Sequence, residues 1–428
     1  MDRRLQDRYL VLVHQHMNTA TALAAGIHGL PHVGNAFAAA QGAWRFFDNQ
    51  RTTLPLLVEP LRELGRQSAC QSWSEYALLV HDWSKLDYAG HAAKTDQVQL
   101  SNSLDHGYEL TTSLLMDAAT GMPLAPMEVS LLAADGRHTT AHEKVQPAIA
   151  HLDQLLPIMQ ASGSWGIGKR LVHIIDREAD SLLHMRQWHA EGHLFVIRAD
   201  NRRVEFRASS HLLSEIVELL QQEKAFQYVR DVEIRNKTGK LFVAQTEMIL
   251  DGSAWQRDED DKKYRVPGEA VPARLVVAQV RNQSGKVMAQ WLLLTNVAAD
   301  VGANTIATWY YWRWKIETFH KLMKSAGLQL EEWQQRTANA ISKRLLVACM
   351  TCVVVWQLEA LTTPPAEALK EFLMNLSGRQ TKRARPITTT GLLAGLHALI
   401  VMLAVLEKYT PEDLRQFAKA AFSPSPSG

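Results

Sequence analysis

This sequence has few cysteines and no long uninterrupted apolar run. Its 428 residues include three cysteines, Cys70, Cys349 and Cys352. An odd number argues against the paired disulfides of secreted proteins. No stretch approaches the roughly 18 consecutive apolar residues of a membrane-spanning helix, and no apolar signal region follows the Met1 to Arg4 start. We therefore expect a cytoplasmic protein that is not embedded in a membrane.

An excess of one charge sign is also missing. The formal net charge is +2, with 46% hydrophobic and 21% charged residues. This composition is typical of a globular protein, and the length allows two or three domains. A nearly neutral total can hide local basic clusters, so it neither requires nor excludes a nucleic-acid partner.

Cys349 and Cys352 form a Cys-x-x-Cys pair that could indicate redox or metal chemistry. They lie inside the apolar segment 345–355, and the chain has no second such pair. Packing in the core is therefore the better interpretation. The 17 histidines are scattered without zinc-like spacing, so surface or core roles are expected for them.

Two apolar runs end on an aspartate. Residues 76–81 precede Asp82 and residues 170–175 precede Asp176, which predicts two buried strands with a carboxylate at each tip. Between them we expect strands at about 108–117 and 127–133 and a helix at about 146–161. A helix at 180–190 and a strand at 193–198 follow, while residues 1–72 show helical spacing.

The segment 200–296 changes character. It is polar and rich in expected strands, at about 228–234, 240–249, 273–280 and 287–295, with a solvated loop at 257–263. It breaks the alternation of strands and helices, so we interpret it as an insertion. Apolar helices are expected afterwards at about 336–361, 365–376 and 389–406. A basic connector joins the last two through Arg379, Lys382, Arg383 and Arg385.

A helix through residues 310–324 would have an unusual polar face. Tyr310, Arg313, Glu317, Lys321 and Lys324 fall within an arc of about 80°, and the opposite side is apolar. One carboxylate in a row of cations could hold a polyanion. A solvated face with an incidental glutamate explains the pattern about equally well.

Together, Asp82, Asp176 and Glu317 predict a metal site. Adjacent strand tips and a helix packed across them could bring the three carboxylates together, and their repulsion would require a cation. Hard oxygen ligands suit Mg²⁺ or Mn²⁺, and two such ions support phosphoryl transfer. Taken singly, each strand-end aspartate is more often a cap or turn residue. The order of elements favours an α/β fold with a ribonuclease-H-like core.

Four residues carry a resemblance to a known family. Tyr310-x2-Arg313-x3-Glu317-x6-Lys324 resembles the Tyr-Arg-Glu-Lys signature of the insertion-sequence-four family of bacterial DDE transposases. The Asp176 to Asp180 segment is similar to the family's second-Asp motif. Asp82, with Leu86 and Tyr88, is similar to its first. Trp83 departs from the family, where a small hydroxyl residue usually follows the first Asp.

The resemblance implies a domain plan and an activity. The segments are a helical DNA-binding region at 1–72, a ribonuclease-H-like core at 73–199 and 297–361, a β-rich insertion at 200–296, and a helical dimerisation region at 362–428. The implied activity is cleavage of transposon ends, through a DNA hairpin, and strand transfer into target DNA. The partners would be double-stranded DNA and a second copy of the chain, in the bacterial cytoplasm and on the nucleoid.

The resemblance also implies roles for individual residues. Asp82, Asp176 and Glu317 would be the catalytic metal ligands, holding two ions of Mg²⁺ or Mn²⁺. The implied DNA contacts are Tyr310, Arg313, Lys321, Lys324, Arg198 and Arg203. Trp291 would stack a flipped base, or it is a core aromatic. Two other functions remain open: a non-catalytic regulator that binds DNA or poisons dimers, and a nuclease of the same fold without strand transfer.

Overall fold

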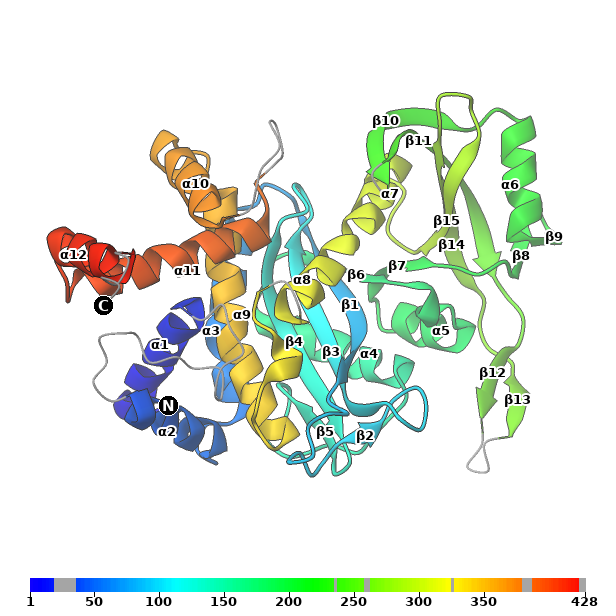
Figure 1. Ribbon diagram of the computed structural model, residues 1–428. Helices are drawn as coiled ribbons and strands as arrows, with labels where there is room; N and C mark the ends of the chain where they lie inside the picture. The colour runs from blue at the N-terminus through cyan, green and yellow to red at the C-terminus, as the bar shows by residue number, and fades with distance from the viewer. Residues whose placement is uncertain (19–35, 235–236, 258–261, 325–326, 379–386, 423–428) are drawn as a thin grey trace.

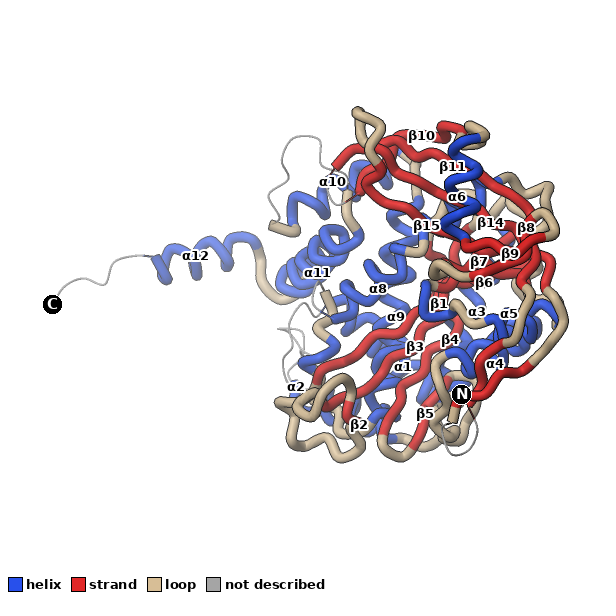
Figure 2. The backbone as a smooth tube through the Cα atoms, turned by 90° about the vertical axis from the view of Figure 1, so that its right-hand side faces the viewer, coloured by secondary structure: helices blue, strands red, loops and turns tan. Residues whose placement is uncertain are grey.

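The computed structural model describes residues 1–18, 36–234, 237–257, 262–324, 327–378 and 387–422. It shows a mixed α/β protein in which a 13-stranded sheet is flanked by helices (Figures 1 and 2). The predicted mixed sheet with helices on its faces is confirmed. The N-terminal and C-terminal helices gather at one end of the molecule, and the strands of segment 200–296 lie at the other (Figure 1).

The middle of the sheet combines antiparallel and parallel strands. Its strands are β1 (Tyr76–Asp87), β3 (His106–Asp117), β4 (Pro123–Ala133), β6 (Arg170–Ile175) and β7 (Leu194–Arg198). Their order is β4-β3-β1-β6-β7. β3 runs antiparallel to β1 and β4, whereas β6 runs parallel to β1 and to β7. The short strands β5 (Gly136–Thr139) and β2 (Val98–Gln99) pair with β4 and β3.

The apolar run predicted Asp82 at a strand tip, and this prediction is wrong. β1 continues to Asp87 because β3 pairs with it along its whole length, Asp82 lying opposite Thr112. The parallel pairing with β6 stops earlier, at Val80 opposite Ile174. Asp82 therefore lies just beyond the point where β1 and β6 separate, on the same edge as Asp176 at the end of β6.

The predicted helix at 146–161 is shorter in the structure. Gln146 instead forms an isolated bridge with Arg137, and Pro147 follows it. The α-helix α4 spans Leu155–Ser162, after a short 3-10 turn at Leu152–Gln154. The next helix, α5 (Leu182–Ala190), follows the prediction closely.

Segment 200–296 does contain the expected strands, and it extends the same sheet. They are β8 (Arg203–Phe206), β9 (Ser209–Leu212), β10 (Gln227–Ile234), β11 (Lys237–Leu250), β14 (Val271–Arg281) and β15 (Val287–Thr295). β15 pairs with β7 and so joins these strands to the middle of the sheet. A separate hairpin, β12 (Ala254–Arg257) and β13 (Lys263–Val266), flanks the predicted loop, of which residues 258–261 lie outside the described part.

One helix in this segment was not predicted. α6 (Leu213–Gln222) buries Leu213, Ile216, Val217 and Leu220 against the sheet. Their i, i+3, i+4, i+7 spacing is the usual signature of an amphipathic helix. It was not predicted because the segments on both sides of it have the pattern of strands.

The remaining helices lie close to their predicted positions. They are α1 (Arg3–Asn18), α2 (Ala36–Asp48), α3 (Leu54–Gln71), α9 (Ala338–Ala360), α10 (Pro364–Leu376) and α11 (Thr389–Leu406). A further helix, α12 (Pro411–Phe422), lies within the helical region predicted at 362–428 and extends away from the body (Figure 2). The basic connector Arg379 to Arg385 falls outside the described residues.

α9 is the core helix of the α-helical end. It packs against α1, α2, α3 and β4. In length and composition it could cross a membrane, but 83% of its most apolar window is buried inside the protein. Cys349 and Cys352 are fully buried on it, which confirms that the Cys-x-x-Cys pair packs in the core.

Candidate active site

Asp176 lies where a backbone N–H, a hydroxyl and a guanidinium meet. It follows the buried end of β6 and caps a 3-10 turn, its side chain accepting from the Arg177 N–H. Tyr310 donates its hydroxyl to Asp176 Oδ1 at 2.9 Å, and Arg313 Nη2 lies 3.3 Å from Oδ2. Burial alone would raise the pKa of Asp176. The charge of Arg313 and these hydrogen bonds lower it instead.

Arg313 connects Asp176 to Glu317. The same Nη2 donates to Glu317 Oε1 at 2.7 Å. Arg313 is only 3% exposed, so its guanidinium is almost completely shielded from solvent. Burial would lower the pKa of Arg313, but Tyr310 and the carboxylates of Asp176, Asp82 and Glu317 raise it. One guanidinium therefore contacts two of the predicted acids, Asp176 and Glu317, and its charge opposes the rise in the pKa of the third, Asp82.

The predicted continuous helix 310–324 is interrupted at Arg313. α7 (Ala303–Trp312) ends there and α8 (Trp314–Lys324) begins. The bonding tightens to i→i+3, with the Arg313 N–H donating to Tyr310 O and the Ile316 N–H donating to Arg313 O. Tyr310 and Arg313 both reach Asp176 across this tight turn, a tertiary contact that the helical spacing did not reveal.

Asp82 faces α8 from the neighbouring strand. Its Oδ2 lies 3.6 Å from His320 Nδ1, and His320 Nε2 lies 3.3 Å from the Thr112 hydroxyl. Burial lowers the pKa of His320 to about 3, so the ring is neutral at physiological pH. Burial raises the pKa of Asp82 to about 6, and the nearby Glu317 and Asp176 charges add to this increase.

His320 was missed by the sequence analysis. It follows Glu317 by three residues and so shares a side of the helix with it. A Glu-x-x-His pair beside a predicted carboxylate cluster could have identified it as a neighbour of the site.

The residues fit a hard divalent cation in their chemistry. The carboxylates of Asp82, Asp176 and Glu317 come from β1, the end of β6 and α8, and such oxygen ligands suit hard cations. Burial raises the pKa of Asp82, and the charges of Glu317 and Asp176 add a smaller increase. Arg313 lies between Asp176 and Glu317, however. Within the described part of the chain, the acids and histidines whose ligand atoms all lie within 4.8 Å of one another are Asp96, Asp135 and His138.

The Asp96 group has structural partners. Tyr108 donates its hydroxyl to one Asp96 carboxylate oxygen, and the Ala338 N–H donates to the other. Asp135 pairs with His138 at 3.0 Å. These contacts tie β3 and β5 to the start of α9.

Trp83 points away from the three acids. Successive side chains of a strand lie on opposite faces, so Trp83 lies on the face of the sheet opposite Asp82. Its ring stacks on His151, with centroids 5.0 Å apart and an angle of 8° between the planes. The unusual residue after the first Asp therefore does not line the carboxylate cluster directly.

Trp291 and Tyr310 lie side by side in the interior. Trp291, on β15, is 9% exposed and Tyr310 is 2% exposed. Their ring centroids are 6.5 Å apart. In this structure both aromatic rings belong to the core beneath the carboxylates.

The four other predicted DNA contacts are distributed unevenly. Arg198 ends β7, and its Nη1 lies 3.7 Å from Asp176 Oδ1. Lys321 is exposed on α8. Lys324 donates to Lys85 O and pairs with Glu331 at 2.9 Å. Arg203 is exposed on β8, five strand positions from β6, so the sheet does not bring it to Asp176.

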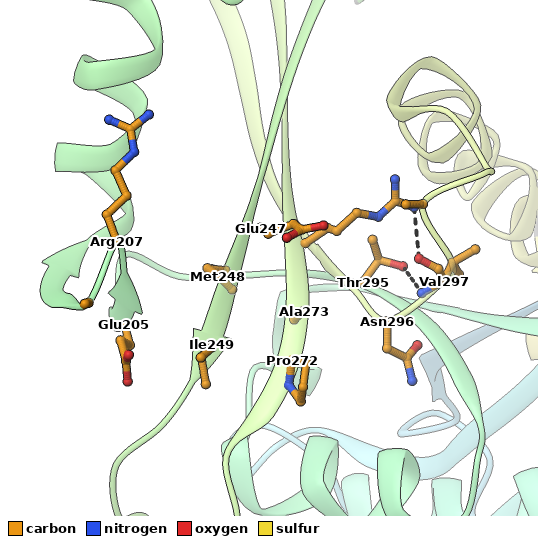
Figure 3. A pocket seen from close by; sticks show the side chains of 13 residues that line it. Glu205, Arg207, Glu247, Met248, Ile249, Pro272, Ala273, Thr295, Asn296 and Val297 are labelled. Carbon is orange, nitrogen blue, oxygen red and sulfur yellow. Dashed lines mark hydrogen bonds between the residues drawn. The ribbon is translucent and has the colours of Figure 1, made fainter.

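An open groove of about 540 Å³ lies apart from these acids. It is lined by β11, β14 and the segment 295–299, including Glu247, Thr295 and Val297 (Figure 3). Arg274, 6% exposed, forms one wall and donates to Val297 O, Ala298 O and Val301 O. Arg274 thereby fixes the loop that leads into α7.

No protein-family model matches the chain. Among solved structures, it is similar to a piggyBac transposase in a synaptic complex with hairpin DNA, determined by cryo-EM. The identity is 10% and the TM-score 0.36, over 100% of this chain and 78% of that chain. A TM-score this low does not establish a shared fold, so the proposal below depends on the residues and their geometry.

Proposed function

We propose that this chain is a DNA transposase of the DDE type with a ribonuclease-H-like core. It would cleave the ends of a mobile element and join the freed 3′-hydroxyl ends to target DNA. The strand order β4-β3-β1-β6-β7, antiparallel on one side and parallel on the other, supports the assignment of the core. The signature from Tyr310 to Lys324 supports the assignment to the insertion-sequence-four family.

One observation carries the proposal. Asp176, after β6, and Glu317, on α8, both contact the buried guanidinium of Arg313, and Asp82, on the neighbouring strand β1, lies 3.6 Å from His320 of the same helix. A fold that needed only ordinary strand caps would not bring three acids from distant segments to one helix and its buried cation. Carboxylates with shifted pKa values, here Asp82 and Asp176, are typical of catalytic sites.

The residues would divide the chemistry as follows. Asp82, Asp176 and Glu317 would hold two Mg²⁺ or Mn²⁺ ions, which when bound would activate the attacking oxygen and stabilise the leaving oxygen. Tyr310 orients Asp176 through its hydroxyl. Arg313 and Arg198 supply positive charge beside the scissile phosphodiester, and Lys321 extends this charge along α8. Water would nick the first strand, the freed 3′-hydroxyl would attack the phosphodiester of the opposite strand to close a hairpin and release the flanking DNA, and a second hydrolysis would reopen the hairpin.

The proposal includes partners and a location. Duplex DNA would bind through the N-terminal helices and the cations of α8, with Trp291 available to a flipped base after a rearrangement. The helices after residue 362 would pair two copies in the synaptic complex. The protein would act in the bacterial cytoplasm, on the nucleoid, without membrane association.

The test is nicking of DNA that carries the inverted repeats bounding the coding region. The purified chain is expected to nick this duplex only with Mg²⁺ or Mn²⁺. Glu317→Gln should retain DNA binding and lose nicking, because it removes one negative charge without changing the shape of the side chain. Glu332→Gln is the matched control. Glu332 is an exposed acid outside the cluster, and this variant should nick normally.

Three outcomes would contradict the assignment in different ways. Nicking without joined donor and target products would identify a nuclease of this fold. DNA binding without any nicking by the wild-type chain would identify a regulator. Normal nicking by Glu317→Gln would show that the three acids do not form the catalytic site.

A further inference from the structure

A row of stacked cations and aromatic rings crosses the outer strands of the sheet. We call it the insertion-sheet surface and define it by five residues: Phe226, Tyr228, Lys240, Phe242 and Arg281. They come from the segment before β10 and from strands β10, β11 and β14. None belongs to the candidate active site.

The five side chains form a continuous series of ring contacts. Lys240 Nζ lies 5.8 Å from the centroid of the Tyr228 ring, and that ring meets Phe242 edge-on at 5.8 Å. The Arg281 guanidinium lies 4.5 Å from the Phe242 ring and 4.9 Å from the Phe226 ring. Contacts of this kind hold cations in place without neutralising them.

Arg281 is also oriented by a buried amide. Its Nε and Nη2 both donate to Gln279 Oε1, and Gln279 is 0% exposed. Nη1 is left without a hydrogen bond to the described protein. A guanidinium positioned by two rings and an amide loses little side-chain entropy when it binds an anion.

The surface is accessible and positive. Tyr228 is 53% exposed, and Lys240 is also exposed. Among the described residues, no carboxylate lies within ion-pair distance of Lys240 or Arg281. Asp231 pairs with Lys240 in the strand register, but its carboxylate accepts from the Tyr228 hydroxyl. In segments 227–250 and 271–295, basic residues outnumber acidic residues by seven to three.

The surface lies on the face of the sheet opposite α7. Leu241, Val243 and Val280 alternate with its residues along β11 and β14, and they pack in the same core as Tyr310. The register places Phe242 opposite Gln279 and Lys240 opposite Arg281, so the cations of the two strands are neighbours on the outer face. Two neighbouring cations without an acid between them match the charge of a phosphodiester backbone.

We propose that the insertion-sheet surface binds the sugar–phosphate backbone of duplex DNA. Lys240 and Arg281 would contact the phosphates, and Phe226, Tyr228 and Phe242 would hold the two cations in position. The inference rests on the proposed function, which supplies DNA as the partner. It adds a contact region that is separate from the acids, the cations of α8 and the N-terminal helices.

The salt dependence of DNA binding tests this inference. The probe is a fluorescein-labelled duplex of mixed sequence, bound by the full chain in EDTA and followed by anisotropy over a series of KCl concentrations. Each phosphate contact contributes about 0.9 to the slope of log Kobs against log [KCl]. Lys240→Gln and Arg281→Gln should each reduce the slope by about 0.9, and Arg281→Lys should retain it.

Lys408→Gln is the matched control. Lys408 is also exposed and lies 5.3 Å from a tyrosine ring, that of Tyr409, but at the end of α11. This variant should have the wild-type slope. Thermal unfolding shows whether Arg281→Gln is folded. Lys240→Gln changes only an exposed side chain, so it gives an independent reading.

The outcomes separate the two proposals. If the wild-type chain binds DNA and the Lys240 and Arg281 variants keep its slope, the insertion-sheet surface is not a DNA contact and the proposed function stands. If Lys240→Gln, Arg281→Gln and Lys408→Gln all lower the slope equally, the change reflects the net charge of the protein and not a local contact. The inference then fails. If the wild-type chain does not bind DNA, the proposed function itself is overturned.

Discussion

Arg313 Nη2 lies 3.3 Å from Asp176 Oδ2 and 2.7 Å from Glu317 Oε1. One buried guanidinium thus joins the end of β6 to the first turn of α8. Each of the two acids stabilises the charge of Arg313, and Arg313 in turn prevents their mutual repulsion. The site and the stability of the fold therefore depend on the same three side chains.

Arg313→Met should destabilise the protein strongly in the absence of divalent cations. Removing the guanidinium leaves Asp176 and Glu317 facing each other without a counter-charge. We expect a loss of about 3 kcal/mol in the free energy of unfolding, measured by urea denaturation in EDTA. Mg²⁺ should recover part of this loss, because it can take over the neutralisation of the carboxylates.

Arg415→Met is the control for this substitution. Arg415 also pairs with a glutamate on its own helix, Glu412, but both side chains are more than half exposed. It should change the free energy of unfolding by less than about 0.5 kcal/mol. Equal effects of the two substitutions on the free energy of unfolding would show that the buried ion pairs of Arg313 contribute no more than an exposed pair.

Tyr310→Phe should cost about 2 kcal/mol of folding free energy, because a hydrogen bond to a charged group is lost in the interior. Tyr311→Phe removes a neighbouring hydroxyl that donates to the Glu233 carbonyl at a more exposed position. It should cost only about 0.5 kcal/mol. Urea denaturation at pH 7 compares them, and a smaller loss for Tyr310→Phe than for Tyr311→Phe would contradict the role given to the Asp176 contact.

Lys94 should make the protein more stable as the pH rises above about 8. Burial lowers its pKa from 10.5 to about 8 in the folded state, where it donates to the carbonyls of Trp333 and Gln335. Between these two pH values the unfolded chain binds a proton that the folded chain lacks. The free energy of unfolding therefore increases with pH in this window, by up to about 1.4 kcal/mol per pH unit.

The comparison of Lys94→Met with the wild type isolates this effect. Lys343, whose pKa burial also lowers to about 8, contributes in the same direction and remains in both proteins. Urea denaturation at several pH values between 7.5 and 10.5 should give a smaller pH slope for Lys94→Met. An unchanged slope would mean that Lys94 keeps its ordinary pKa in the fold.

The sequence predicted the strands of the middle of the sheet because burial on both faces leaves a long apolar run. The run before Asp176 matches β6 residue for residue. It could not predict that β1 continues beyond Asp82, since that depends on β3, a partner distant in the chain. Local pattern locates a strand, whereas its pairing determines where it ends.

The candidate site was only partly predictable for the same reason. The three acids were identified from their positions on two strands and a helix. The break between α7 and α8 was not, because Arg313 and Tyr310 are held by Asp176, more than 130 residues earlier. Arg313 was expected to face a DNA strand. It is buried instead because it pairs with Asp176, and helical periodicity cannot predict a contact with a distant segment.

The pairing of β15 with β7 limits which segments the protein could lose without exposing a strand edge. If residues 200–296 were removed as a cassette, β7 would be left with an unpaired edge next to the strand that ends at Asp176. Exposed edges of this kind promote association between chains. Loss of β15 would therefore require another element to cover the edge of β7.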